Sequence, residues 1–204
     1  MYNYEKRKLS FQIVPETAWY ENLRSVLPNW AEISSNVRSI GHCEICGAIT
    51  DELDAHEVWF YNDKDHEQKL VDIIAVCKDC HHAIHIGYAS VNGTWKEALR
   101  HYTKINNCSP LESIAEMEEA RAVWEKRSQV QWKLNEDELK EKVKELTGID
   151  CNIDEAIDGK YYAMVSYDQK DIAKSMGAKW DWKRKMWYFN SKEEKEAYIA
   201  FSKR

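Results

Sequence analysis

Four cysteines in two close pairs constrain the fold of this 204-residue chain more than any other feature of its sequence. Cys43 and Cys46 form one C-x-x-C pair, and Cys77 and Cys80 form a second pair about 30 residues later. Two such pairs supply four soft thiolates, which suit a tetrahedral zinc ion and leave it no open coordination position. We therefore predict one structural Zn²⁺ that fixes two distant segments of the chain to each other.

A pattern of histidines accompanies the second cysteine pair. His81 and His85 are four residues apart, so a helix would place both imidazoles on one face. His56 lies in an alternating, aromatic-rich stretch over 53–61 that is typical of a strand. A strand with His56, a second strand and a helix with His81 and His85 would form a ββα unit whose imidazoles reach one cation. Alternatively, His81 and His85 are a partly buried, hydrogen-bonded pair.

Composition and charge exclude some classes of protein. Hydrophobic residues make up 44% of the chain, enough for a core, yet no apolar run approaches the roughly 20 residues of a membrane span. The polar stretch 1–10 lacks the apolar segment of a signal peptide, so we expect a soluble, cytoplasmic protein without a membrane partner. Residues 1–150 carry a net charge of −8 and residues 151–204 a net charge of +2, so nucleic-acid contacts must come from local patches.

Capping signals and breaks in the hydrophobic pattern divide the chain into three expected parts. These are an N-terminal helical extension over 1–41, a zinc-bound module with a helical extension over 42–148, and a small C-terminal domain over 149–204. Helices are predicted over about 18–27, 29–40, 109–128 and 135–148. The C-terminal domain should contain strand, helix, strand, strand and helix in that order. The fold class is therefore α+β, with a zinc-stabilised ββα module among helices and a small C-terminal α/β domain.

The order of these motifs resembles HNH (His-Me finger) endonucleases that carry flanking zinc knuckles. The resemblance covers about residues 14–135 and rests on the two cysteine pairs and on the segments Ala55-His56-Glu57-Val58 and Cys80-His81-x-x-x-His85. It implies a second, catalytic metal site for Mg²⁺ or another divalent cation, held by His56, His81 and His85. The implied activity is hydrolysis of phosphodiester bonds of DNA, with RNA or single strands as the alternative partner, by a protein of the kind found in phages and mobile elements.

The chain departs from this family in the residues next to the metal. The family has Asp-His or His-His on the first strand, where this chain has His56-Glu57. If Val58 takes the apolar position, His56 is the metal ligand and Glu57 the general base. If His56 is instead the base, Ala55 stands at the ligand position and cannot bind a cation. The asparagine of the family corresponds to Asp72, which completes the candidate catalytic set.

A second resemblance covers about Tyr161 to Asn190. The segments Val165-Ser-Tyr167, Lys170-Asp171, Gly177-Ala178-Lys179-Trp180-Asp181 and Lys185-Met-Trp187-Tyr188 are similar to a small domain of unknown function. That domain is often fused to primases, helicases and nucleases of plasmids and phages. Aromatic residues beside a basic turn suit base stacking with phosphate contact. The candidate nucleic-acid-binding residues are Trp182, Lys183, Arg184 and Lys185.

Three functions are consistent with these patterns. The first is a metal-dependent HNH endonuclease with a C-terminal domain for nucleic-acid binding. The second is a catalytically degenerate HNH-like zinc module that binds nucleic acid without cleaving it. The third is an anti-defence factor that binds a host or phage protein, which the acidic charge of residues 1–150 favours. Cys108 and Cys151 belong to none of these sites and are expected to be structural thiols.

Overall fold

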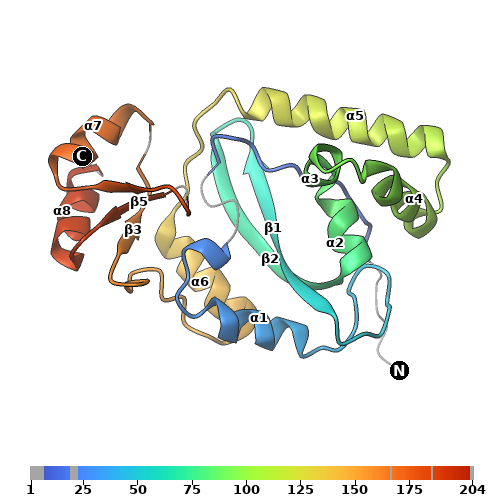
Figure 1. Cartoon of the computed structure of the whole chain (residues 1–204), viewed down its shortest axis with the longest axis horizontal. Coiled ribbons are helices and arrows are strands. Elements are labelled where there is room, and N and C mark those ends of the chain that lie inside the picture. The colour runs from blue at the N-terminus through green and yellow to red at the C-terminus, as the bar shows by residue number, and fades with distance from the viewer. Residues whose placement is uncertain (1–6, 19–22, 166, 185, 203–204) are drawn as a thin grey trace. The chain divides into compact units, whose positions relative to one another are not determined.

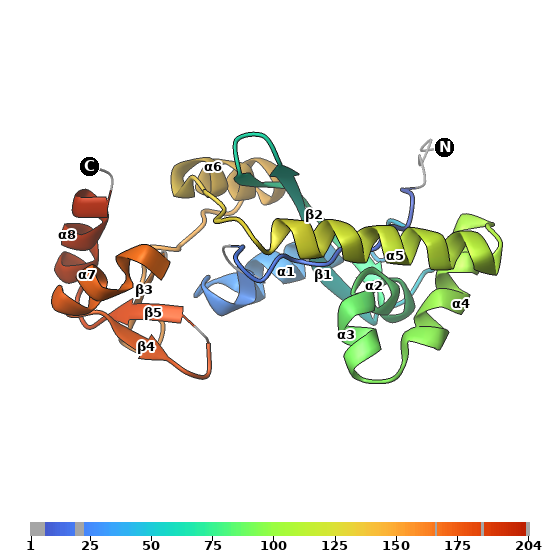
Figure 2. The same cartoon turned by 90° about the horizontal axis from the view of Figure 1, so that it is seen from above.

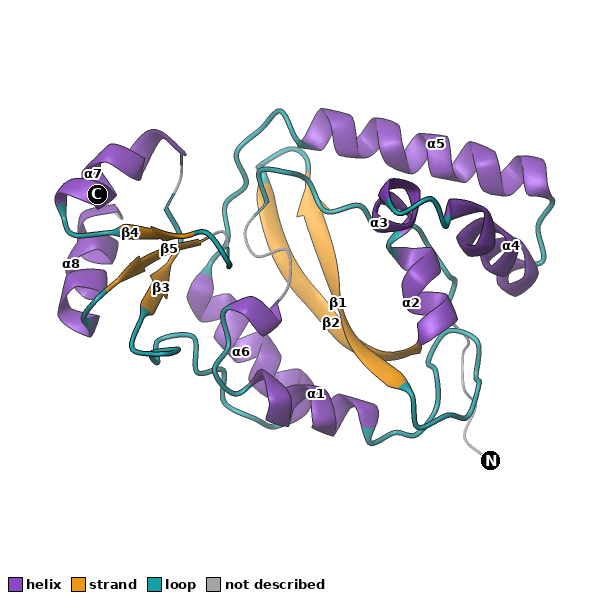
Figure 3. Cartoon of the chain, in the orientation of Figure 1, coloured by secondary structure: helices purple, strands orange, loops and turns teal. Residues whose placement is uncertain are grey.

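The computed structural model describes residues 7–18, 23–165, 167–184 and 186–202 (Figure 1). Its described part holds eight α-helices and two small antiparallel sheets (Figure 3), which confirms the predicted α+β class. The chain forms two compact units. Unit 1 comprises Met1–Ala18 and Ile33–Leu134, and unit 2 comprises Trp19–Glu32 and Asn135–Arg204. None of the helices in these described ranges is long and apolar enough to cross a membrane.

Unit 1 is built on a hairpin of two long strands. Strands β1 (Leu53–Asn62) and β2 (Glu67–Cys77) pair antiparallel, with a register shift at Val58/Trp59. Helix α2 (Lys78–Ile84) starts at the residue after β2 and packs on both strands. This arrangement is the ββα unit predicted from the sequence. The predicted helix included His85, whereas α2 ends one residue before it. The His85 N–H still donates to the His81 carbonyl at 3.1 Å, as in a helical turn.

Three further helices complete the helical side of unit 1. They are α3 (Ile86–Val91), α4 (Trp95–Asn106) and α5 (Pro110–Arg127). Helix α5 begins with the predicted capping box, in which Ser109 Oγ accepts from the Glu112 N–H and Glu112 accepts from the Ser109 N–H. The core of the unit joins α2 and α4 to β2 through Ala75, Ala83, Leu99 and Tyr102.

The N-terminal segment 7–18 threads between the hairpin and α5, as two perpendicular views show (Figures 1 and 2). The Gln12 N–H donates to the Ile84 carbonyl at the end of α2 over 2.9 Å. The side chain of Asn106 bonds both the N–H and the carbonyl of Leu9, at 3.2 and 2.9 Å. Leu9 itself is fully buried, so this segment belongs to the core of unit 1.

The expected helix over 18–27 falls partly on residues 19–22, which lie outside the described residues. The described remainder contains the 3₁₀ turn η1 (Leu23–Ser25). Helix α1 (Trp30–Arg38) follows Asn29, as the sequence predicts, and the boundary between the two units falls within it.

Unit 2 contains α6 and a small mixed domain. Helix α6 (Glu136–Thr147) has the predicted N-cap at Asn135 and C-cap at Gly148, which adopts φ 71°. After it come β3 (Tyr161–Ala163), the turn η2 (Tyr167–Gln169), α7 (Lys170–Ser175), β4 (Lys179–Asp181), β5 (Met186–Phe189) and α8 (Lys192–Ser202). The sheet is antiparallel in the order β3-β5-β4. Phe189 of β5 and Tyr198 of α8 belong to the core of this domain. The predicted order of elements is confirmed.

Candidate metal centres

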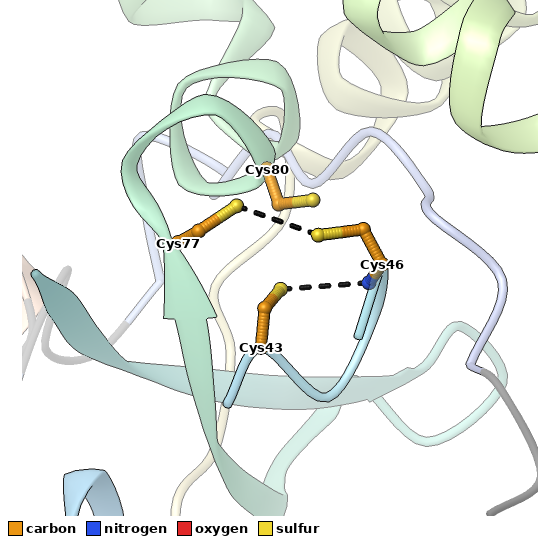
Figure 4. A group of neighbouring side chains, drawn as sticks. All are labelled: Cys43, Cys46, Cys77 and Cys80. Atoms are coloured by element: carbon orange, nitrogen blue, oxygen red, sulfur yellow. Dashed lines mark hydrogen bonds between the residues drawn. The ribbon is translucent and has the colours of Figure 1, made fainter. Parts of the chain in front are cut away.

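The four predicted zinc ligands meet in one cluster. Cys43 and Cys46 come from the loop before β1, Cys77 ends β2, and Cys80 lies in the first turn of α2 (Figure 4). Their sulfur atoms all lie within 4.8 Å of one another, and Cys46 Sγ and Cys77 Sγ are 3.6 Å apart. Two sulfurs bound at about 2.3 Å to a tetrahedral zinc ion would be about 3.8 Å apart. The four cysteines are therefore close enough together to bind one zinc ion.

Electrostatics also favour a cation among these thiols. A hydrogen bond from Cys80 lowers the pKa of Cys43 to about 4, while burial raises the pKa of Cys77 to about 11. The pKa of Cys80 is raised by its bond to Cys43 and by burial. The raised pKa values of Cys77 and Cys80 favour their protonated thiols beside the Cys43 thiolate, whereas a divalent metal would compensate several thiolates together.

Two contacts around the cysteines were not evident in the sequence. His101 Nε2 in α4 lies 3.2 Å from Cys80 Sγ. The Glu44 N–H donates to the Ala75 carbonyl at 2.9 Å, and Glu44 Oε2 accepts from the Ala75 N–H at 2.6 Å. The first cysteine loop is thereby fixed to β2, and His101 can donate to a metal-bound sulfur as an outer-sphere partner.

The three predicted histidines form a second, separate cluster. His56 lies in β1, His81 in α2 and His85 directly after α2, and their ligand nitrogens all lie within 4.8 Å of one another. His81 Nε2 and His85 Nε2 are 3.1 Å apart. Two imidazole nitrogens at about 2.05 Å from a tetrahedral zinc ion would be about 3.3 Å apart. The arrangement therefore fits one cation with three protein ligands, which leaves room for further ligands.

Burial favours the neutral, metal-binding form of His56 and His85. Burial, followed by the charges of His85 and His81, lowers the pKa of His56 to about 2. Burial and the charge of His81 lower the pKa of His85 to about 4. Because His56 is only 3% exposed, a second positive charge beside it would be poorly solvated. Neutral imidazoles keep a nitrogen lone pair available at physiological pH.

Asp54 and Gln12 orient two of these rings. Asp54 Oδ2 lies 2.9 Å from His81 Nδ1, and its other oxygen accepts from Lys78 Nζ at 2.5 Å. Burial opposes ionisation of Asp54, but the bonds from Lys78 and His81 outweigh it and lower the carboxyl pKa. A proton on His81 Nδ1 directs Nε2 toward the cluster, as a carboxylate partner commonly does for a metal-bound histidine. On the other side, His56 Nε2 lies 3.2 Å from Gln12 Oε1.

The structure does not bring the other two candidate catalytic residues into this cluster. Glu57 is 8% exposed, and the alternation of side chains along β1 turns it away from His56. Asp72 pairs with Val58 across the hairpin, and its Oδ2 accepts from Arg7 Nη2 at 2.5 Å. Its Oδ1 accepts from the Ile73 N–H at 2.9 Å. Asp72 is thus held in a salt bridge with the N-terminal segment.

The candidate nucleic-acid-binding residues follow β4 in unit 2. Trp182 is 85% exposed and Lys183 is exposed, whereas Arg184 is half-buried. The fourth candidate, Lys185, lies outside the described residues. The turn is held by Asp181, whose Oδ1 accepts from the N–H groups of Lys183 and Arg184 at 2.9 and 3.1 Å. The turn therefore presents an exposed indole next to basic side chains.

Comparison with known proteins identifies the C-terminal domain only. The model of a family described as "Domain of unknown function (DUF5710)" matches residues 160–203, so the chain carries this domain at its C-terminal end. No HNH family model matches the chain. The searches of curated proteins and of solved structures found no match either. The HNH resemblance of unit 1 therefore rests on its motifs.

Proposed function

We propose that this protein is a divalent-metal-dependent endonuclease of the HNH type that hydrolyses phosphodiester bonds of DNA. The observation that supports the proposal is the three-imidazole cluster of His56, His81 and His85 on a ββα unit. The four cysteines are suited to fix the end of β2 to the start of α2. Helix α2 holds His81, and His85 follows directly after it, so this junction positions two of the three imidazoles. Structural and catalytic metals thus have separate ligand sets.

Each residue of the cluster has a defined task in this proposal. A divalent cation held by the three imidazoles would supply a Lewis acid for the scissile phosphate and a means to activate water. Asp54 fixes the His81 tautomer through the 2.9 Å contact at Nδ1. Gln12 orients the buried ring of His56 from the N-terminal segment. The low pKa values of His56 and His85 keep both rings neutral and available as ligands.

Glu57 is the candidate general base that the HNH resemblance implies. It is adjacent to His56 in β1, but strand alternation turns it toward the other face of the hairpin. If Glu57 takes the proton of the attacking water, Glu57→Gln should lower the cleavage rate by about 100-fold without changing metal affinity. An unchanged rate would remove Glu57 from the reaction and leave proton transfer to solvent or to another group.

The test of the proposal is nicking of supercoiled plasmid DNA by zinc-loaded protein with added Mg²⁺, Mn²⁺ or Ni²⁺. We expect the wild type to nick DNA and His81→Ala not to do so. His82→Ala is the matched control, because His82 is the next residue but its Nε2 contacts Thr94 Oγ1 at 2.8 Å, away from the cluster. Nicking that survives in His81→Ala, or none with any metal from folded wild type, would contradict the proposal.

A non-catalytic binding module is the second candidate function. It is favoured by the absence of Glu57 and Asp72 from the described ligand group and by the net charge of −8 over residues 1–150. Such a module would retain DNA or single strands through Trp182 and the adjacent basic residues, with an affinity that falls as salt rises. A pull-down from host lysate, with and without nuclease treatment, distinguishes nucleic acid from a host or phage protein as its partner.

A further inference from the structure

Three tryptophans lie next to one another on the hairpin of β4 and β5 in the C-terminal domain (Figure 2). Trp187 packs against the core of the domain and is half-buried, as is Trp180, whereas Trp182 is 85% exposed. The ring centroids of Trp180 and Trp187 are 5.3 Å apart, and those of Trp180 and Trp182 are 6.3 Å apart. These three indoles, which we call the tryptophan ladder, lead from the core to solvent.

The exposed end of the tryptophan ladder is held by the residues on both sides of it. Asp181, which precedes Trp182, accepts from the N–H groups of Lys183 and Arg184 at 2.9 and 3.1 Å. It also accepts from Lys160 Nζ at 2.6 Å, which ties the turn to the start of the domain. A side chain on a backbone that is already ordered loses less conformational entropy when a ligand binds. The turn therefore presents the indole of Trp182 in a form that is ready to bind.

The charge of the domain favours an anionic partner. Residues 160–204 contain 11 Lys and Arg against 6 Asp and Glu, a net charge of +5, whereas the whole chain has a net charge of −6. Lys183 is exposed in the turn, and Lys174 Nζ lies over the Trp187 ring at 5.6 Å. Lys174 also pairs with Asp171 at 3.3 Å, but both side chains are more than half exposed, so this ion pair is weak. The tryptophan ladder thus has cations beside it.

An exposed indole with neighbouring cations matches the chemistry of an unpaired nucleic-acid strand. Each unpaired base offers a ring face for stacking, and each phosphate offers a negative charge for a lysine. The bases of a duplex already stack on one another, so their faces are closed to a side chain on the surface. An acidic peptide would satisfy the lysines but would offer no ring face to Trp182. The observations therefore favour a single strand over a duplex or a peptide.

We infer that the tryptophan ladder binds single-stranded DNA, with a base stacked on Trp182 and phosphates at Lys183 and Lys174. The inference makes the ligand of the C-terminal domain specific, and its choice of DNA rests on the proposed function. Binding itself needs no divalent metal, because the histidine cluster belongs to unit 1 and the ladder to unit 2. The domain would thus hold unpaired strand for a nuclease unit or without one.

The test measures the fluorescence anisotropy of labelled oligonucleotides of about 15 nucleotides with the zinc-loaded full chain, without a second metal. The probes are a DNA single strand, its DNA duplex and the RNA strand of the same sequence. We expect the DNA single strand to bind most tightly, and Trp182→Ala to weaken it about 10- to 100-fold, as the loss of one stacked base does. Trp182→Phe should recover part of this affinity. Tyr88→Ala is the matched control, since Tyr88 is 70% exposed on α3 of unit 1.

Preference for the DNA single strand that Trp182→Ala removes and Tyr88→Ala keeps supports the inference. No binding, equal or tighter binding of the duplex or of RNA, or an affinity that Trp182→Ala leaves unchanged overturns it. Because no second metal is present, His81→Ala should bind the single strand as the wild type does. Strand binding by a protein that does not nick plasmid would overturn the proposed nuclease only, and nicking without strand binding would overturn this inference only.

Discussion

Single residues around His81 decide whether the histidine cluster can hold a cation. His81 Nδ1 faces the Asp54 carboxylate at 2.9 Å, and His81 Nε2 faces His85 Nε2 at 3.1 Å. A neutral imidazole has one N–H and one lone pair, so the proton at Nδ1 leaves the lone pair at Nε2 for a metal. The carboxylate of Asp54 therefore sets which atom of His81 is the ligand.

We predict that Asp54→Asn weakens divalent-metal binding at the histidine cluster by about 10- to 100-fold. The amide cannot supply the negative charge that polarises His81, although it keeps the size of the side chain. Metal titration by calorimetry of zinc-loaded protein measures the effect. Asp51→Asn, in the exposed loop before β1, is the control and should bind as the wild type does. Equal affinities for Asp54→Asn and wild type would show that Asp54 does not orient His81.

Asp181 has a comparable organising role in unit 2. It is 9% exposed and accepts from Lys160 Nζ at 2.6 Å and from Tyr162 Oη at 2.7 Å, besides the two N–H groups of the basic turn. The bonds from Lys160 and Tyr162 hold its pKa well below the usual range of a carboxyl group. Its ionised form is thus stabilised in the folded domain.

The sign of the resulting pH dependence follows from that lowered pKa. Asp181 stabilises the fold above the pKa of an unfolded aspartate, about 3.9, and this contribution is lost as pH falls toward the lower folded value. We predict that Asp181→Asn lowers the free energy of unfolding of the C-terminal domain by about 2 kcal/mol near neutral pH. Below pH about 4, the stability of this variant should depend less on pH than that of the wild type. Hydrogen exchange of residues 160–202 at several pH values measures it. Asp171→Asn, whose side chain is 78% exposed, should behave as the wild type, and a similar loss there would refute the specific role of Asp181.

At the scale of elements, α5 is long but has few buried residues. It spans 18 residues, but Ser113 is the one residue classed as buried within it. Little core packing holds its first turn, so the reciprocal bonds between Ser109 and Glu112 matter.

We expect Ser109→Ala to lower the free energy of unfolding by about 1 kcal/mol, because the Glu112 N–H at the start of α5 loses its acceptor, the Ser109 hydroxyl. Urea denaturation followed by far-UV circular dichroism provides the measurement. Ser39→Ala is the control, since the exposed Ser39 hydroxyl bonds only the nearby Asn36 carbonyl, at 2.6 Å. Indistinguishable midpoints for the two variants would mean that the cap contributes nothing to stability.

Local sequence signals predicted several of the elements. The caps at Ser109 and Asn135, the ββα order and the element order of the C-terminal domain each follow from patterns within a few residues. The contacts that build the site could not be predicted this way. Gln12 meets His56 across 44 residues, and His101 meets Cys80 across 21, without a repeating pattern to indicate either pair.

At the scale of the whole molecule, zinc is expected to act on unit 1. The four cysteines join the loop before β1 to the junction of β2 and α2, and the histidine cluster depends on that junction. Zinc bound by four cysteines can contribute on the order of 10 kcal/mol to folding, which is comparable to the whole stability of a domain. The DUF5710 domain has a separate core around Phe189 and Tyr198.

We therefore predict that Cys77→Ser, or removal of zinc by a strong chelator, abolishes the cooperative fold of residues 33–134. Hydrogen exchange should show lost protection over that range and retained protection over residues 160–202. Cys108→Ser is the matched control, because Cys108 lies outside the four-cysteine group. This variant protein should keep its zinc ion. Full protection of residues 33–134 after complete zinc removal would contradict this prediction.

The central claim is that one closed cysteine site and one open histidine site bind two metals with different tasks. Titration of cobalt(II) into zinc-loaded protein, followed by visible absorption and by total metal content, tests it most directly. We predict one retained zinc and one cobalt without thiolate charge-transfer bands in the wild type, and one retained zinc without cobalt in His81→Ala. Cobalt that displaces zinc and shows thiolate bands, with no second binding event, would contradict the account.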